Sequence, residues 1–325
     1  MTADGPSRDG RMGRHVTGGF DRLLHLGNVV VDIVLDVPAL PERGGDVLAT
    51  GSVLTPGGGF NVMVAAARQG LPVAYAGAHG SGPFAALARA ALADAGITAL
   101  QPPKAGIDTG FAVSIVDAEG ERTFVTSRGA EATLTSADLG GISAAPGDAS
   151  YLSGYGLVHP SNRAALLGWL GRLPAGHAVF ADPGPLVQLI PPDALERVLG
   201  RADWWTCNAR EAALLTGSQD PVAAARALAR RPGSRGVLVR TGPDGCLLGR
   251  GGSAPVRVPG FDVDVLDTNG AGDAHTGTFI AALARGLDAV AAAREANAAA
   301  ALSVTRRGPA TAPTAAELAR FLAGR

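Results

Sequence analysis

The sequence predicts an α/β fold built on a mostly parallel sheet, because short apolar runs alternate with helical runs along most of its 325 residues. The apolar, strand-like runs are 23–35, 73–76, 178–181 and 236–240. The helical runs between them are 62–68, 85–95 and 222–230. Strands that are joined through helices pair in parallel, so we expect helices on both faces of the sheet.

Local signals mark the ends of these elements. Gly70 and Gly96 follow the first two helical runs and fit helix C-terminal caps. Pro221 stands just ahead of the third helix, where a proline suits the first turn. The strand 236–240 runs into Thr241-Gly242, and in folds of this class ligands bind at the carboxyl ends of such strands.

Two segments interrupt the alternation, at about 32–55 and 109–126. The second is predicted to be a hairpin, with a strand at 111–116, a turn at Asp117-Ala118-Glu119-Gly120 and a return strand at 122–126. Because hairpin strands are antiparallel, they do not belong in a parallel core. We therefore expect a second, smaller sheet.

The composition is that of a soluble globular protein, with 46% hydrophobic and 18% charged residues. A net charge of −1 predicts no nucleic-acid partner, and no apolar run long enough for a membrane span is free of charge. Cys207 and Cys246 are expected to be buried free thiols in a reducing cytoplasm. The polar, glycine-rich residues 1–22 are predicted to be a disordered tail ahead of a domain at 23–325.

The single lysine narrows the ways in which this chain could bind a nucleotide. Lys104 is followed by Ala105, so the lysine-containing phosphate loop G-x-x-x-x-G-K-[ST] cannot occur. The glycines at 57–59 also lack the G-x-G-x-x-G spacing of dinucleotide-binding folds. Any nucleotide chemistry must therefore use another architecture.

The most informative motif is Asp267-Thr268-Asn269-Gly270-Ala271-Gly272-Asp273, which precedes an apolar helical run at 274–283. Free N–H groups and the helix dipole attract an anion at a helix start, and Gly270, Ala271 and Gly272 let it approach closely. Asp273 could accept a proton from an attacking hydroxyl beside that anion. The alternative is that Asp273 only complements the helix dipole.

A second motif, Pro56-Gly57-Gly58-Gly59-Phe60-Asn61, precedes the helical run 62–68. Its glycines expose a stretch of backbone, and Asn61 offers two donors and an acceptor next to it. A polar ligand could lie here, although the motif could equally be a flexible turn with Asn61 as helix cap.

Together these motifs, in this order and roughly 200 residues apart, resemble the ribokinase/PfkB family of carbohydrate and nucleoside kinases. The late motif matches DTxxAGD, and Gly57, Gly58 and Asn61 match the early GG…N motif. Further matching segments are 27–32, 108–110, 208–211, 215–217, 241–245, 297–301 and 306–308. The resemblance implies a three-layer ribokinase-like fold whose small β-sheet forms a lid over the sugar and often mediates dimerisation.

The resemblance also implies an ATP-dependent phosphoryl transfer to a hydroxyl group, with Asp273 as the base and Gly270, Ala271 and Gly272 as the anion hole. Sugar contacts are implied for Asp32, Gly57, Gly58 and Asn61. Magnesium and phosphate contacts are implied for Asn208 and Glu211. Nucleotide contacts are implied for Arg240, Gly242, Gly245 and Asn297. A monovalent cation, expected to be potassium, is implied at Asp267 and at the carbonyls of Asn269, Ser303, Arg306 and Gly308.

The substrate is the least determined part of this interpretation. Gly156 stands where ribokinases carry an acidic sugar contact, and Tyr155 or His159 could face a larger substrate such as a nucleoside base. A ribose- or fructose-like sugar is the first hypothesis, and an adenosine- or pseudouridine-like nucleoside is the second. A protein that binds ligand without turnover is a third, against which the intact base and anion loop argue.

Overall fold

The computed structural model describes residues 19–325, so most of the predicted tail lies outside the described residues. In this part of the chain a nine-stranded sheet has the strand order β13-β12-β11-β10-β9-β8-β1-β4-β5. The strands are β1 (Arg22–His25), β4 (Val73–Tyr75), β5 (Thr98–Ala99), β8 (Asp148–Ser153), β9 (Ala178–Asp182), β10 (Trp204–Asn208), β11 (Gly236–Arg240), β12 (Cys246–Gly249) and β13 (Val256–Val258). Only β12 and β13 join the sheet in antiparallel fashion, which confirms the predicted mostly parallel sheet.

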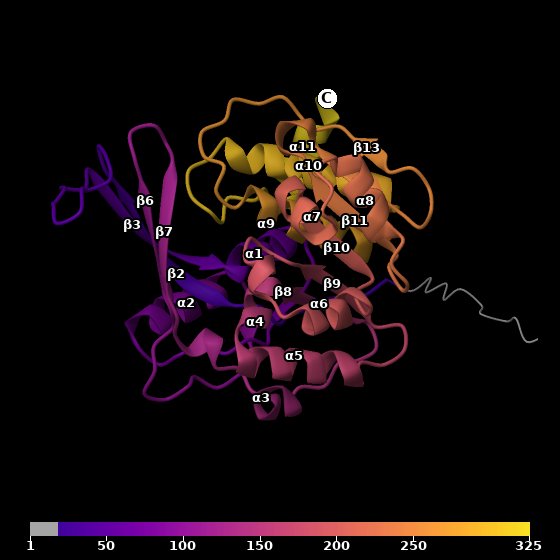
Figure 1. Ribbon diagram of the computed structural model, residues 1–325, viewed down its shortest axis with the longest axis horizontal. Coiled ribbons are helices and arrows are strands. Elements are labelled where there is room, and N and C mark those ends of the chain that lie inside the picture. Colours follow the sequence, from indigo (N-terminus) through magenta and orange to yellow (C-terminus); the bar gives the residue numbers. More distant parts are fainter. Residues whose placement is uncertain (1–18) are drawn as a thin grey trace, which may run out of the picture.

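Helices cover both faces of this sheet (Figure 1). They are α1 (Gly59–Arg68), α2 (Pro83–Asp94), α3 (Ser136–Gly140), α4 (Gly154–Val158), α5 (Pro160–Arg172), α6 (Pro192–Leu199), α7 (Ala209–Thr216), α8 (Pro221–Ala229), α9 (Ala271–Ala284), α10 (Ala289–Val304) and α11 (Ala315–Ala323). Single 3₁₀ turns occur at Ala130–Ala132, Val187–Leu189 and Gly242–Asp244. The predicted helices at 62–68, 85–95 and 222–230 are confirmed to within a few residues.

Successive strand residues pack into different layers, as the period of two in a strand requires. Leu24 and Trp205 belong to a core with α5, α6 and α8, whereas Leu23 and Trp204 belong to a core with α1, α2, α9 and α10. Both cores consist largely of fully buried leucine, valine, alanine and aromatic side chains. The architecture is therefore three-layered, with one core on each side of the sheet.

The apolar run 23–35 does not form one strand. It contains β1 and part of β2 (Val29–Asp36), which belong to different sheets. The chain leaves the large sheet at Gly27, where an added Cβ would lie 2.6 Å from the His25 ring. The ordered fold also begins before residue 23, because Phe20 is buried and β1 starts at Arg22.

The second sheet, which we call the lid, has the order β3-β2-β6-β7, with β3 (Gly51–Gly58), β6 (Phe111–Val116) and β7 (Arg122–Ser127). The predicted hairpin is confirmed, because β6 and β7 pair antiparallel from Phe111 opposite Ser127 to Val116 opposite Arg122. The pair β2–β6 is parallel, so the lid is a mixed sheet. Its strands β3, β6 and β7 extend away from the helical layers (Figure 1).

Two acidic side chains, Asp108 and the buried Glu131, fix the base of the lid. Asp108 accepts hydrogen bonds from the backbone N–H groups of Phe84 (3.1 Å) and Ala85 (2.8 Å) and thereby caps α2. Glu131 accepts from the N–H groups of Gly110 (2.7 Å) and Gly129 (2.8 Å). Charge-assisted bonds of this kind are stronger than neutral ones, so the lid strands leave the body in a defined direction.

Both cysteines are buried free thiols, as predicted. Within residues 19–325, no helix combines the length and the apolar character that a bilayer span requires.

The helices α1 and α9 pack closely at Gly277, and this contact gives a stability prediction. A Cβ at Gly277 of α9 would lie 2.4 Å from the Val62 carbonyl oxygen. We expect Gly277→Ala to lower the free energy of unfolding by about 1–3 kcal/mol through overpacking. Chemical denaturation measures this.

Gly168→Ala in α5 is the matched control, because nothing lies within 4 Å of its added Cβ. It should stabilise the protein by about 0.5–1 kcal/mol through the helix propensity of alanine. Equal effects of the two substitutions would contradict the packing argument.

Candidate active site

The two motifs meet where α1 and α9 begin side by side. Asn61 in the first turn of α1 donates a hydrogen bond from Nδ2 to Asp273 Oδ2 at 3.0 Å, across 212 residues of sequence. Both belong to the helix starts that the sequence places after glycine-rich loops. The structure therefore brings the predicted base and a predicted sugar contact into direct contact.

Gly270 forms the entry to α9. It is the N-cap with φ of 76°, a left-handed conformation that favours glycine, and an added Cβ would lie 1.9 Å from the Pro309 carbonyl oxygen. Gly272 has ordinary helical geometry, and its added Cβ would face the Arg240 guanidinium at 3.4 Å. The first N–H groups of a helix lack intrahelical acceptors, so this entry presents donors to an anion.

A network of buried charges lies beside this helix entry. Arg240, at the end of β11, donates from Nη1 and Nη2 to Asp182 Oδ2 at 3.1 and 3.2 Å and from Nη1 to the Thr276 hydroxyl at 3.2 Å. Its Nη2 also lies 3.7 Å from a Glu211 oxygen. Thr206 donates to Asp182 at 3.0 Å. Arg240, predicted to contact nucleotide, is thus the cation of an acidic cluster.

Burial raises the pKa of Asp273 to about 6. The charges of Asp182 and Asp32 act in the same direction, whereas the Asn61 hydrogen bond and Arg240 oppose them. A carboxyl group with such a pKa is mostly ionised near neutral pH and can still accept a proton, which is the property of a general base.

Asp32 has a similar environment. Burial raises its pKa to about 6. Gly57 on the neighbouring strand leaves the room for it, because a Cβ there would lie 2.1 Å from Asp32 Oδ2. The predicted sugar residues Asp32 and Gly57 are therefore in contact, and Gly58 provides the left-handed residue (φ 62°) that leads into α1.

Asn208 and Glu211 form a reciprocal cap at the start of α7. The Asn208 side chain accepts from the Glu211 N–H, and the Glu211 carboxylate accepts from the Asn208 N–H, each at 2.8 Å. Burial and the charge of Asp182 raise the pKa of Glu211, although Arg240 and the Asn208 N–H oppose them. Within residues 19–325, no group of three His, Cys, Asp or Glu residues has the geometry of a metal cage. Magnesium usually needs only one or two carboxylates and keeps several waters.

The remaining predicted nucleotide residues are split between two environments. Gly242 and Gly245 flank the turn after β11, with φ of 69° and 92°. Asn297 in α10 uses its side chain internally: it donates to the carbonyls of Val258 (2.9 Å) and Pro259 (3.0 Å), and its Oδ1 lies 3.1 Å from His275 Nε2. The structure gives Asn297 an anchoring role for the strand end of β13.

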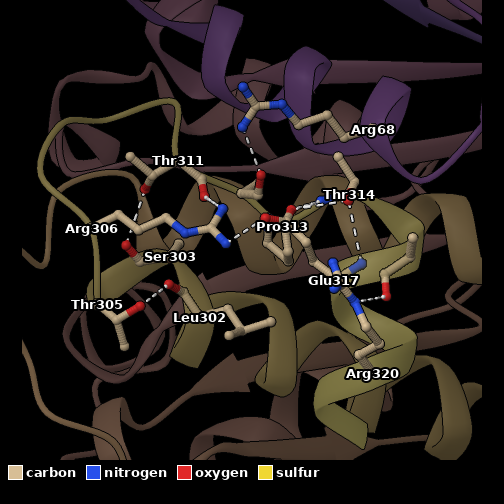
Figure 2. Close-up of polar contacts among 12 residues, drawn as sticks. Arg68, Leu302, Ser303, Thr305, Arg306, Thr311, Pro313, Thr314, Glu317 and Arg320 are labelled. Carbon is tan, nitrogen blue, oxygen red and sulfur yellow. Dashed lines mark hydrogen bonds and ion pairs between the residues drawn. The ribbon is translucent and has the colours of Figure 1, made fainter.

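The predicted cation residues lie together, and the Asp267 carboxylate and the Ser303 carbonyl already have hydrogen-bond partners. Asp267 Oδ1 accepts from the Asn269 N–H at 2.8 Å, and Oδ2 accepts from the Gly308 N–H at 3.0 Å. The Ser303 carbonyl accepts from the Thr311 hydroxyl and from the Arg306 N–H, both at 3.1 Å, and the first of these is drawn in Figure 2. The Arg306 side chain points away, to Thr311 and Glu317 (Figure 2).

Asp182 is a residue of the site to which the sequence assigned no role. It directly follows the predicted strand 178–181, so its position at a carboxyl strand end was the available signal. Tyr155, which the sequence suggests could face the substrate, lies in α4 and is 38% exposed. Burial raises its pKa to about 12, as do the charges of Asp273, Glu211, Asp182 and Asp32. The Tyr155 ring therefore lies close enough to the acidic site to sense each of these carboxylates.

Comparison with known proteins gives this site its class. Residues 21–316 match the pfkB family of carbohydrate kinases, and the chain belongs to this family. A sugar kinase of Escherichia coli (strain K12) is 33% identical over 297 residues, covering 90% of this chain and 91% of that protein. An ATP-dependent ribose-1-phosphate kinase of Halopiger xanaduensis is 33% identical over 312 residues, covering 94% and 99%.

Solved structures agree with the sequence comparison. The crystal structure of ribokinase from Thermotoga maritima superimposes with a TM-score of 0.80 at 27% identity, covering 94% of this chain and all of that chain. Aminoimidazole riboside kinase from Salmonella enterica, solved with aminoimidazole riboside and an ATP analogue, gives a TM-score of 0.75 at 28% identity, covering 93% and 99%. The fold is ribokinase-like, and the protein is a phosphotransferase of the carbohydrate kinase class.

The buried Asp32 carboxylate predicts a stability penalty that depends on pH. The pKa of Asp32 is about 6 in the folded protein, against 3.8 for an ordinary aspartate, so the folded state binds this proton more tightly than the unfolded state does. The free energy of unfolding therefore falls as pH rises between these two values. We expect Asp32→Asn to stabilise the protein at pH 7.5 by on the order of 3 kcal/mol. Most of this gain should disappear at pH 4.5, which denaturation at the two pH values measures.

Asp36→Asn is the control, since Asp36 is an exposed aspartate at the end of the same strand. It should change stability little at either pH. An Asp32→Asn protein that is no more stable than wild type at pH 7.5 would show that burial does not penalise this carboxylate.

Proposed function

We propose that this protein is an ATP-dependent kinase that transfers the γ-phosphate to a hydroxyl group of a ribose- or fructose-like sugar. One observation carries the proposal: Asp273 follows the anion loop Gly270–Gly272 directly and is held by Asn61 at 3.0 Å. The proposed base and the N–H groups that would face the phosphate thus lie within the first turn of α9. Phosphoryl transfer depends mainly on this kind of positioning and charge stabilisation.

In this proposal Asp273 accepts the proton of the sugar hydroxyl. The hydroxyl oxygen forms the new bond to the γ-phosphorus, and the bond from that phosphorus to the β–γ bridging oxygen breaks, so ADP leaves with the electron pair. The N–H groups of Gly270, Ala271 and Gly272 stabilise the charge on the transferring group. The Asn61 bond to Oδ2 orients the carboxylate, so that Oδ1 faces the acceptor.

Magnesium is proposed beside Asn208 and Glu211, where it would neutralise phosphate charge. The donor set fits, because the carboxylates of Asp182, Glu211 and Asp273 outnumber the single cation Arg240 that contacts the cluster. Two relatives support the choice of ATP. One is the ribose-1-phosphate kinase, whose name states that it is ATP-dependent, and the other is aminoimidazole riboside kinase, which was solved with an ATP analogue. Gly242 and Gly245 are proposed to lie along the nucleotide, while a nucleotide contact of Asn297 stays a prediction.

The sugar is proposed to bind between Asp32, the backbone of Gly57 and Gly58, and Asn61. The support is the Asp32 carboxylate, which lies against Gly57 and whose pKa is raised by burial to about 6. A buried carboxylate in this state gains from hydroxyl donors, and a polyol supplies several of them.

A nucleoside acceptor is the second candidate. The exposed part of Tyr155, close to the acidic site, could stack on a base or an imidazole ring. Aminoimidazole riboside kinase, whose named ligand carries such a ring, has the same fold at 28% identity.

We propose a homodimer that forms through the lid. The two edge strands expose apolar side chains, namely Val53 and Leu54 on β3 and Phe124 and Val125 on β7, each more than half exposed. Unpaired edges that carry such side chains favour association. A cytoplasmic location stays a prediction.

The role of Asp273 gives the first activity prediction. Asp273→Asn should lower kcat by roughly 10²–10⁴-fold while nucleotide affinity stays close to wild type, because the amide cannot accept the hydroxyl proton. Steady-state kinetics and nucleotide titration measure the two effects. Asp193→Asn is the matched control, since Asp193 also lies in the first turn of a helix but in α6, away from the site. Equal kcat for both variants would assign Asp273 to helix stability alone.

A panel assay of coupled ADP release tests the substrate. We expect one pentose, hexose or sugar phosphate to give the highest kcat/KM. Preference for adenosine, pseudouridine or an imidazole riboside would favour the nucleoside candidate, and Tyr155→Ala should then raise KM for it by about 5- to 150-fold, the cost of a lost base stack. Ligand binding without ADP release for every compound would overturn the proposal of catalysis.

A further inference from the structure

The lid reaches the anion loop through one arginine. Arg122, the first residue of β7, donates from Nη2 to Asp267 Oδ1 at 2.5 Å, and its Nη1 lies 3.5 Å from the Thr268 hydroxyl. The two residues of this ion pair lie 145 positions apart in sequence. Their side chains are 24% and 16% exposed, so the pair is largely shielded from solvent. A positive charge from the lid therefore lies on the carboxylate that the family resemblance assigns to a monovalent cation.

The oxygens expected around that cation do not fit a second positive ion while Arg122 is in place. Asp267 already accepts from Arg122 and from the N–H groups of Asn269 and Gly308, which uses three of its roughly four acceptor positions. The Thr311 hydroxyl lies 3.1 Å from the Ser303 carbonyl and 3.3 Å from the Gly308 carbonyl. Figure 2 shows the bond from Thr311 to Ser303. Protein donors thus occupy most of the acceptor positions of Asp267 and contact two of the four expected carbonyls.

The location of this ion pair links it to the reaction. Asp267 opens the loop that ends in Gly270–Gly272, and the Asn269 N–H bond to Asp267 shapes that loop. The opposite end of Arg122's hairpin is anchored on the body through Asp108 and Glu131. In this structure the lid therefore places the Arg122 guanidinium on the loop that is proposed to hold the phosphate. A charged, planar guanidinium suits a carboxylate and a hydroxyl on one side of it.

We propose that Arg122 is a positioning residue that takes the place of the monovalent cation, so that lid closure orders the anion loop and turnover needs no potassium. This inference rests on the proposed kinase function. Arg122 acts on the reaction through Asp267 and touches no reacting atom.

The test compares two salts at equal ionic strength, potassium chloride and tetramethylammonium chloride. Wild-type kcat should agree within about twofold between them, because the guanidinium already occupies the site. Arg122→Ala should lose about 10- to 100-fold of kcat in tetramethylammonium, since a loop without its counter-charge misplaces the phosphate, and should recover most of the loss in potassium. Arg122→Lys, which keeps the charge, should stay insensitive to the salt.

A readout without substrate separates this inference from the proposed function. The melting temperature of Arg122→Ala should be higher in potassium than in tetramethylammonium, whereas the wild-type value should be the same in both salts. This comparison holds even if no compound of the panel is phosphorylated. Arg250→Ala is the matched control, because it removes an exposed arginine outside the site and should behave as wild type. Arg122→Gln replaces the alanine variant if that variant does not fold.

The decisive quantity is the difference in potassium response between variant and wild type. A response that appears only when Arg122 is replaced by a neutral residue supports the proposal. Wild-type protein that potassium activates or stabilises as strongly as the variant would overturn it, and so would a variant whose loss is the same in both salts.

Discussion

The hydrogen bond between Asn61 and Asp273 joins the two halves of the chain at the site, and most of the surrounding arrangement depends on it. It requires α1 and α9 to start side by side, which the Gly277 contact with the Val62 carbonyl permits at close range. Both helices pack on the same face of the sheet, in the core that contains Leu23 and Trp204. The position of Asp273, the proposed base, is therefore set by helix packing, and not by the flexibility of the loops that precede the helices.

The charge balance around this contact explains why the site is suited to a highly charged substrate. Arg240 contacts Asp182 and Glu211. The negative charge of Asp182 also raises the pKa of Asp273. Removing carboxylates from water is unfavourable unless a partner compensates, and one guanidinium compensates incompletely for several carboxylates. Cations that arrive with a nucleotide relieve this imbalance. The free site is thus less stable than the bound one, which is a common cost of function.

Local sequence patterns predicted the structural features that are determined by residues close together in the chain. The hairpin at 111–126, the helix that begins at the anion loop and the glycine caps were all readable because each is decided within a few residues. The run 23–35 was not, because apolar composition does not reveal that Gly27 sends the chain from one sheet to another. The pairings of Arg240 with Asp182 and of Arg122 with Asp267 join residues 58 and 145 positions apart, and no local pattern encodes such contacts.

The lid illustrates a long-range contact whose proposed function cannot be recognised from the sequence of its own strand. In the sequence Arg122 is one polar residue at the start of an exposed strand, and its neighbours on β7 are largely solvent-exposed. What distinguishes it is the direction of the hairpin, which the capped α2 and the buried Glu131 define at the base. A rigid base makes the far end of the hairpin reproducible in position, and only then can a single guanidinium meet the Asp267 carboxylate. In the proposed mechanism the placement of the anion loop thus depends on hydrogen bonds at the opposite end of a separate sheet.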